Sequence, residues 1–279
     1  MLCTPPYPLD AIMPFRCPDI EDRTLSLPRI MCLHGGGTNA RIFRMQCRGL
    51  IAQLKSEFRL VFAEAPFVSH AGPDVLSVYS QWGPFKRWLR WRPEHPEISH
   101  EDVVREIDNC LENAKSQDDG LGATGEWVAL LGFSQGAKLC ASLLYRQQAR
   151  AETYGKHVAG PNYRFGILLA GRAPLIYLDL APALHHVLPD ASQITDIEWH
   201  LKQTLRNQGH VLRVPTIHVH GMRDQGLELH RQLFEEYCAQ DRRRIVEWDG
   251  EHRVPLKFND VLLIVHAIRE LAEETGVFN

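Results

Sequence analysis

The amino-acid sequence predicts an α/β fold in which helices cover both faces of a mostly parallel sheet. Short apolar runs alternate with longer amphipathic stretches along the chain, and this alternation is typical of a parallel α/β sheet. Several of the short runs are apolar on both faces, as expected for strands buried between two helical layers. The 279 residues suit one large domain or two small ones. Because the alternation recurs along the whole chain after residue 28, we expect a single domain at 29–279.

The expected elements can be placed from the apolar pattern. The strand-like runs are Arg29–Leu33, Arg59–Ala63, Trp127–Leu131, Phe165–Ala170, Val214–Val219 and Arg244–Trp248. The helix-like runs lie at about 40–55, 100–116, 135–150, 194–206, 227–239 and 259–273. In the last run the apolar residues share one helical face.

The composition excludes several classes of protein. Hydrophobic residues make up 44% and charged residues 23%, which is ordinary for a globular domain with its own core. The net charge of −3 argues against a nucleic-acid binder, and no run of 18 apolar residues is present that could span a membrane. The seven cysteines are scattered and form no C-x-x-C pair, which predicts a reduced, cytoplasmic protein without a zinc site. The composition leaves the oligomeric state open.

One segment precedes the alternation, and two stretches interrupt it. Residues 1–28 are proline-rich and aperiodic, so we expect an extended N-terminal arm on the surface. The stretches 64–98 and 172–193 each follow an expected strand and should lie at the carboxyl edge of the sheet, where such folds bind ligands. The second stretch carries seven large aliphatic residues between prolines. We expect it to form a small lid over an apolar pocket, the alternative being that these residues complete the core.

The motif Gly132-Phe133-Ser134-Gln135-Gly136 carries the strongest chemical signal. It lies directly between an expected strand and an expected helix, which is the context of a nucleophile elbow. Glycines two residues before and after the serine allow a sharp turn, and the helix N-terminus favours developing negative charge. Ser134 is therefore the candidate nucleophile, the alternative being a helix N-cap serine between glycines.

A nucleophilic serine needs a base and an orienting carboxylate, which follow it in the order acid, then histidine. Asp224 follows the expected strand at 214–219, and His252 follows the strand at 244–248, so both should reach the carboxyl edge. We prefer Asp224 to Asp249, because Asp249 lies too near His252 in sequence to orient it easily. His252 is likewise preferred to two alternatives, His218 and His220, which fall in or at the end of a buried strand.

The sequence Leu33-His34-Gly35-Gly36-Gly37 ends the first expected strand and is similar to the H-G-G-G oxyanion loop of esterases. We expect the backbone amides of Gly36 and Gln135 to form the oxyanion hole, with His34 structural. Each such donor lowers the barrier by about 3 kcal/mol. The glycine run lacks the spacing of a phosphate-binding loop.

Two polar clusters receive a structural interpretation. Lys86, Arg87, Arg90 and Arg92 lie among tryptophans, and we expect a solvated positive face, the alternative being a docking patch for an acidic partner. The pair at 185–186, His185 and His186, has no partnering cysteine or carboxylate pattern, so no metal site is predicted.

Together these motifs resemble the fungal FSH family of serine hydrolases, within the α/β-hydrolase superfamily. The matching stretches are L-H-G-G-G-T-N-A at 33–40, L-G-F-S-Q-G-A at 131–137, H-V-H-G-M-R-D at 218–224 and W-D-G-E-H-R-V-P at 248–255. In particular, the chain resembles the polyketide-cluster hydrolases of the citrinin and lovastatin type. The resemblance implies an α/β-hydrolase fold and carries the nucleophile onto Ser134, the acid onto Asp224 and the base onto His252. The arm of about 28 residues departs from many compact members.

The resemblance also implies a reaction. It is the cleavage of an acyl thioester, releasing or editing a polyketide chain held on an acyl carrier protein, with no cofactor. A general carboxylesterase acting on small free esters would use the same three residues. A catalytically silent binding protein on this fold is the third interpretation, against which the intact motifs argue.

Overall fold

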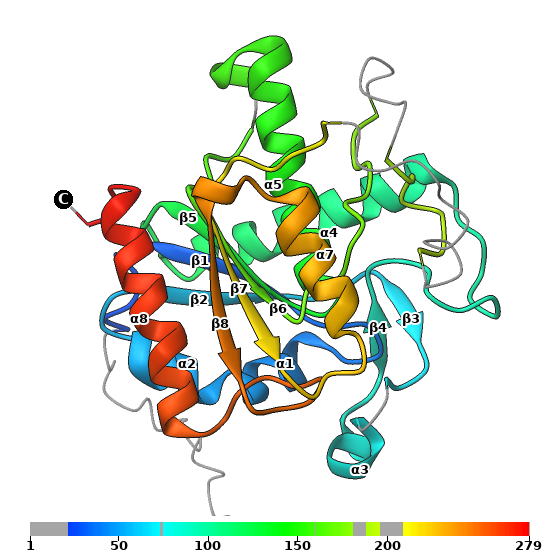
Figure 1. Ribbon diagram of the computed structural model, residues 1–279, viewed down its shortest axis with the longest axis horizontal. Coiled ribbons are helices and arrows are strands. Elements are labelled where there is room, and N and C mark those ends of the chain that lie inside the picture. The colour runs from blue at the N-terminus through cyan, green and yellow to red at the C-terminus, as the bar shows by residue number, and fades with distance from the viewer. Residues whose placement is uncertain (1–21, 73–74, 159, 181–187, 196–208, 279) are drawn as a thin grey trace, which may run out of the picture.

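The computed structural model describes residues 22–72, 75–158, 160–180, 188–195 and 209–278. In this part of the chain, six parallel strands form the central sheet in the order β2-β1-β5-β6-β7-β8 (Figure 1). The strands are β1 (Arg29–Leu33), β2 (Arg59–Ala63), β5 (Trp127–Phe133), β6 (Phe165–Leu169), β7 (Thr216–Gly221) and β8 (Arg243–Trp248). The predicted α/β class and parallel sheet are confirmed, and all six expected runs form strands.

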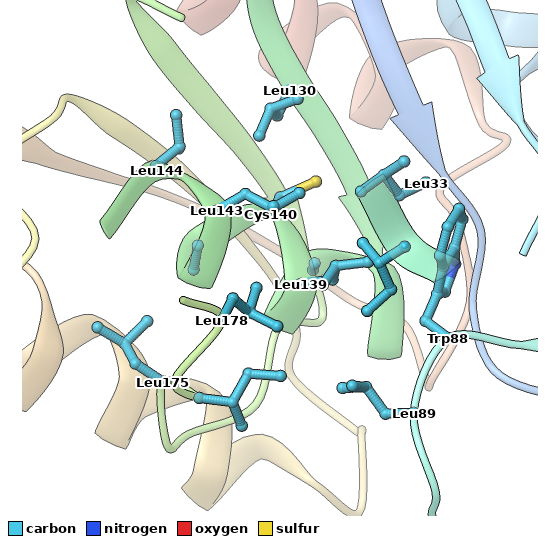
Figure 2. Packing of buried hydrophobic residues seen from close by; sticks show 14 of the residues in the cluster. Leu33, Trp88, Leu89, Leu130, Leu139, Cys140, Leu143, Leu144, Leu175 and Leu178 are labelled. Atoms are coloured by element: carbon cyan, nitrogen blue, oxygen red, sulfur yellow. The ribbon is translucent and has the colours of Figure 1, made fainter. Parts of the chain in front are cut away.

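Helices cover both faces of this sheet (Figure 1). One layer contains α4 (His100–Gly120), α5 (Gln135–Tyr154) and α7 (Leu227–Tyr237), and the other α1 (Ala40–Gln46), α2 (Arg48–Leu54) and α8 (Phe258–Glu274). Alternate side chains of β1 divide between the layers: Met31 and Leu33 pack with the first, Ile30 and Cys32 with the second. Figure 2 shows the first layer, where leucines of α5 lie close to Leu130 of β5. Two separate apolar cores thus hold the sheet rigid beneath its carboxyl edge.

The helix expected at 40–55 is two helices, because the chain bends at Cys47. Cys47 has φ −83° and ψ 7°, which departs from helical geometry and separates α1 from α2. The bend lets α2 approach α8 at Gly49, where an added Cβ would lie 3.1 Å from a methyl group of Val261. The sequence pattern misses the bend because both helices keep the same apolar periodicity across it.

The stretch at 64–98 has local structure that the sequence did not predict. β3 (Phe67–Ser69) and β4 (Phe85–Arg87) pair antiparallel, and the short helix α3 (Val75–Tyr79) lies between them in sequence. β4 is also tied to the loop after β1, since Gly37 N donates to Lys86 O at 2.8 Å. Strands of three residues are too short to show a two-residue periodicity.

The basic cluster in this stretch differs from the expected solvated face. Arg87 is fully buried, with its guanidinium 5.0 Å from the ring centroid of Phe67. Arg90 pairs with Glu97 at 2.9 Å, and Arg92 stacks on Trp91. The expectation is therefore wrong for Arg87, because this side chain is buried against the ring of Phe67 and is not solvated.

The stretch at 172–193 contributes to the core in the part that the structure describes. Leu175, Ile176 and Leu178 are buried against α4 and α5, and Figure 2 shows Leu175 and Leu178 near α5. Leu180 is exposed. For these three residues the alternative interpretation, that they complete the core, describes what is observed. Residues 181–187, with the histidine pair and part of the predicted lid, lie outside the described residues, as does most of the helix expected at 194–206.

The end of the expected N-terminal arm is anchored to the sheet by charge; residues 1–21 lie outside the described residues. Asp22 accepts a hydrogen bond from Arg59 at 2.7 Å. Arg59 and Arg29, at the starts of β2 and β1, both bond Asp118 near the end of α4, at 2.8 and 3.3 Å. Asp118 is 5% exposed, so this carboxylate neutralises two partly desolvated guanidinium groups. No helix in the described ranges is long and apolar enough to cross a membrane.

Replacing Asp118 should destabilise the fold. In Asp118→Asn, Arg29 and Arg59 lose their buried counter-charge and keep the exposed partners Asp119 and Asp22, so we expect a cost of about 2 kcal/mol, typical of hydrogen bonds to charged groups. We expect the free energy of unfolding, measured by urea titration with tryptophan fluorescence as the signal, to fall by this amount. The control is Glu112→Gln, which breaks the exposed pair with Lys115 and should change stability by less than about 0.5 kcal/mol. Equal effects of the two substitutions would contradict the role given to Asp118.

Candidate active site

Ser134 lies in the sharp turn between β5 and α5. Its φ of 53° and ψ of −113° are strained for a residue with a side chain. An added Cβ on Gly132 would lie 2.4 Å from the carbonyl group of Gly136, and one on Gly136 would lie 2.0 Å from Leu33 O. Both contacts are impossible for any other residue. The turn therefore requires glycine at both positions, and it presents the Ser134 side chain at the carboxyl edge of the sheet.

His252 bridges Ser134 and Asp224. Its Nε2 lies 2.8 Å from Ser134 Oγ, and its Nδ1 lies 2.6 Å from Asp224 Oδ2. An ionised carboxylate can only accept, so Nδ1 carries the proton and Nε2 is free to accept the serine hydroxyl proton. The three side chains come from three loops at the carboxyl ends of β5, β7 and β8. The sequence-predicted nucleophile, base and acid thus lie in one hydrogen-bonded series.

The environment of Asp224 keeps it ionised. Burial raises the pKa of this carboxyl group, but the hydrogen bond and charge of His252 and the amide of Gly226 outweigh burial and lower the pKa to about 2. Gly226 N donates to Oδ1 at 2.7 Å, which leaves Oδ2 for His252. Asp224 can therefore orient the imidazole and stabilise its charged form.

The alternatives considered from sequence lie elsewhere. Asp249 has a side chain that is 80% exposed and pairs with Arg223. His218 is buried in β7 and contacts the Thr216 hydroxyl at 3.1 Å, and burial holds its pKa well below the usual value. Burial also lowers the pKa of His220 to about 4. Both histidines are therefore neutral. In the described part of the chain, neither forms a hydrogen bond with Ser134 Oγ.

Two unused amides lie beside the serine. In the described part of the chain, neither Gly36 N nor Gln135 N donates a hydrogen bond to a protein acceptor. The two residues are neighbours, since an added Cβ on Gly36 would lie 3.3 Å from the Gln135 side chain. His34 is buried, accepts from Ala65 N at 3.1 Å and holds the loop in place. Two free amides at this position are suited to binding an oxyanion.

The side chain of Gln135 also has a positioning role that the sequence did not indicate. Its Oε1 accepts from Trp88 N at 2.8 Å and Leu89 N at 3.1 Å, while Nε2 donates to Leu89 O at 3.1 Å. Trp88 Nε1 in turn donates to His34 O at 2.9 Å. One side chain therefore joins the elbow to the insertion at 64–98. The motif itself gives no signal for this role. It becomes visible only through the hydrogen bonds between the Gln135 side chain and the distant residues Trp88 and Leu89.

Three further side chains near the series were not predicted. His230 of α7 is fully buried with Nε2 3.7 Å from Asp224 Oδ2, and burial lowers its pKa to about 3. Arg172 lies 3.8 Å from Asp224 Oδ1, and Lys138 is in the first turn of α5. The ligand atoms of Asp224, His230 and His252 lie within 4.8 Å of one another, but Asp224 and His252 are already bonded to each other. We therefore assign these atoms to the hydrogen-bonded series and not to a metal.

The sheet order, the strand–serine–helix turn and the three loops define an α/β-hydrolase fold. Residues 24–261 match the family described as "Serine hydrolase (FSH1)". The chain belongs to this FSH1 serine hydrolase family and is a hydrolase.

Similar proteins agree with this assignment. The chain is 67% identical to esterase claE of Penicillium crustosum over 259 residues, which covers 93% of this chain and 98% of that protein. It is 66% identical to esterase citA of Monascus ruber, covering 92% of this chain and 97% of that protein. The crystal structure of the Bacillus cereus carboxylesterase shares the fold with a TM-score of 0.50 at 14% identity, over 90% of this chain and 91% of that one.

Replacing Gly136 by alanine should disrupt the elbow. The new Cβ would meet the Leu33 carbonyl at 2.0 Å, so strand β1 or helix α5 must move. We expect Gly136→Ala to lower the melting temperature by several degrees, or to prevent folding, in differential scanning fluorimetry. Gly120→Ala is the matched control, because an added Cβ there meets nothing within 4 Å. A Gly136→Ala protein as stable as Gly120→Ala would contradict the packing argument.

Substitutions of the two candidate aspartates, Asp224 and Asp249, should differ sharply in their effect on turnover. Asp224→Asn keeps the shape but favours the wrong imidazole tautomer, so we expect kcat to fall about 10⁴-fold. Asp249→Asn removes only a surface ion pair and should change kcat little. Steady-state hydrolysis of a chromogenic ester measures both, and the reverse ranking would overturn the assignment of Asp224.

Proposed function

We propose that Ser134, His252 and Asp224 act as a catalytic triad, with the amides of Gly36 and Gln135 as the oxyanion hole. The observation that carries the proposal is the double hydrogen bond of His252, to Ser134 Oγ at 2.8 Å and to Asp224 Oδ2 at 2.6 Å. This is the geometry that an activated nucleophile requires: a base within reach of the hydroxyl, itself oriented by a third group.

The mechanism follows from these contacts. His252 Nε2 accepts the proton of Ser134 Oγ as the oxygen attacks the acyl carbonyl carbon. The developing oxyanion accepts hydrogen bonds from the two free amides, while Asp224 stabilises the charged imidazole. His252 then gives the proton to the leaving thiol or alcohol, and an acyl-enzyme remains on Ser134. Water repeats the attack, with His252 again as base, and releases the acid.

We propose as the substrate an acyl thioester, a polyketide chain carried on an acyl carrier protein. The resemblance of the motifs to polyketide-cluster hydrolases supports this substrate. The competing candidate is a carboxylesterase acting on small oxygen esters, and the names of the similar fungal proteins, which are called esterases, favour it. Both substrates fit the same triad, because the leaving group is chosen by the surroundings of the acyl carbonyl and not by the nucleophile.

A direct comparison of the two substrates tests the proposal. We expect kcat/KM for an acyl chain on a carrier protein to exceed that for the same acyl group as a free p-nitrophenyl ester by at least about tenfold. Ser134→Ala serves as the blank for both reactions, and it should lose several powers of ten in turnover while remaining folded.

Two results would contradict the proposal. A clear preference for the free ester would transfer the function to the carboxylesterase. Residual turnover of more than a few per cent in Ser134→Ala would show that another residue is the nucleophile. Labelling by a fluorophosphonate, lost in Ser134→Ala, separates an active hydrolase from a silent binding protein without any choice of substrate.

A further inference from the structure

Lys138 is a buried amine one helical turn after the nucleophile. It lies in the first turn of α5, where its backbone N–H donates to the backbone oxygen of Ser134 at 3.0 Å. This backbone hydrogen bond places Lys138 one helical turn after Ser134, which is the N-cap of α5. Lys138 is 7% exposed, and its Nζ donates to Thr195 Oγ1 at 2.7 Å. Among the described residues, no carboxylate lies within 4 Å of this amine.

Arg172 provides a second cation at the same edge. It follows β6, and Ser134 N is bonded to Leu169 O, the last residue of that strand, at 2.8 Å. The guanidinium lies directly over Gly226, where an added Cβ would be 2.6 Å from Nε. This Nε is buried and has no hydrogen-bond partner in the described part of the chain. The carboxylate near it is Asp224, at 3.8 Å, whose two oxygens already accept from His252 and Gly226.

Among the described residues, the carboxylate that lies near these two cations is Asp224, 3.8 Å from Arg172. Burial, together with the nearby charge of Arg172, lowers the pKa of Lys138 to about 7, and burial also lowers the pKa of Arg172. Buried charges are normally paired, because desolvation of an unpaired charge is costly. A buried amine and a half-exposed guanidinium with an unused Nε thus have one nearby carboxylate, Asp224, in the described part of the chain, and both oxygens of Asp224 already accept hydrogen bonds from His252 and Gly226.

A bound anion would remove this imbalance. We propose that Lys138 and Arg172 form an anion-binding subsite for the acyl chain, which selects acyl groups carrying an anionic oxygen over plain alkyl chains. The shared chemistry is a charged oxygen acceptor, either a carboxylate or the enolate of a 1,3-dicarbonyl. The inference rests on the proposed function, since it assigns the substrate class of the same site. If the subsite exists, the pocket that binds the acyl chain has a positively charged end, whereas the sequence analysis predicted an apolar pocket.

Matched substrates test the subsite. The first pair is p-nitrophenyl hexanoate and the mono-p-nitrophenyl ester of adipic acid, which differ by a methyl or carboxylate end. The second pair is the N-acetylcysteamine thioesters of hexanoic and 3,5-dioxohexanoic acid. We expect the wild-type enzyme to favour one or both oxygen-bearing chains by about tenfold or more in kcat/KM, as a charge-assisted hydrogen bond allows. The pair that shows the preference identifies carboxylate or enolate as the anion.

Lys138→Met tests the residue itself. Methionine keeps the length and removes the charge, so we expect the preference to fall to about one while turnover of the hexanoyl substrates is kept. Lys138→Arg should restore part of the preference. Lys156→Met, which removes an exposed charge beyond the far end of α5, controls for the general field and should leave the preference unchanged. Melting curves confirm that the variants fold, with Lys138→Gln as a second neutral variant.

Two results would overturn the proposal: equal kcat/KM within each pair for the wild-type enzyme, or a preference that survives in Lys138→Met. Binding of the two p-nitrophenyl esters to Ser134→Ala, measured by calorimetry, gives a readout without turnover. Tighter binding of the carboxylate-ended ester, lost in the double variant with Lys138→Met, supports the subsite even if the proposed reaction is wrong. Failure to hydrolyse any ester or thioester would instead count against the proposed function alone.

Discussion

The contact between Gly136 and the carbonyl oxygen of Leu33 is the constraint on which the site depends. It brings the end of β1 against the start of α5 so closely that no side chain fits between them. Ser134 is held in a strained turn as a consequence, and Gln135 is placed beside Gly36. Gln135 then binds the backbone of Trp88 and Leu89, and Trp88 binds His34. One close backbone approach thus fixes the positions of Ser134, of the free amides of Gly36 and Gln135, and of the backbone at 88–89.

The side chains around Asp224 differ in charge because burial and hydrogen bonding set their pKa values differently. Asp224 is kept ionised by two donors, and the buried histidines around it, His220 and His230, are kept neutral by desolvation. A neutral neighbour cannot replace His252 as the counter-charge of Asp224, so the carboxylate acts on one imidazole. Arg172 lies 3.8 Å from Asp224, and its charge helps to lower the pKa of the buried Lys138. The hydrogen-bonded series of Ser134, His252 and Asp224 therefore has both neutral histidines and positively charged side chains around its carboxylate.

The fold was largely predictable because its signals are local. A buried parallel strand needs only a short apolar run, and all six were recognisable from such runs. The elements that were missed depend on distant contacts. The bend at Cys47 follows the packing of α2 on α8. The short strands β3 and β4 exist because they pair with each other and because β4 also pairs with the loop after β1. Arg87 was misjudged because its burial against Phe67 is not visible in a charge count.

The sequence by itself determined the α/β class, the strand–serine–helix turn and the order of Ser134, Asp224 and His252, because each depends on residue type and short-range spacing. Only the tertiary structure shows the contact itself: Asp224, which the sequence analysis preferred to Asp249, bonds His252, while Asp249 lies at the surface. It also decided that Lys138, Arg172 and His230 lie around the series. Those three residues are scattered in sequence and carry no motif, and only the folding of separate loops onto one sheet edge brings their charges together.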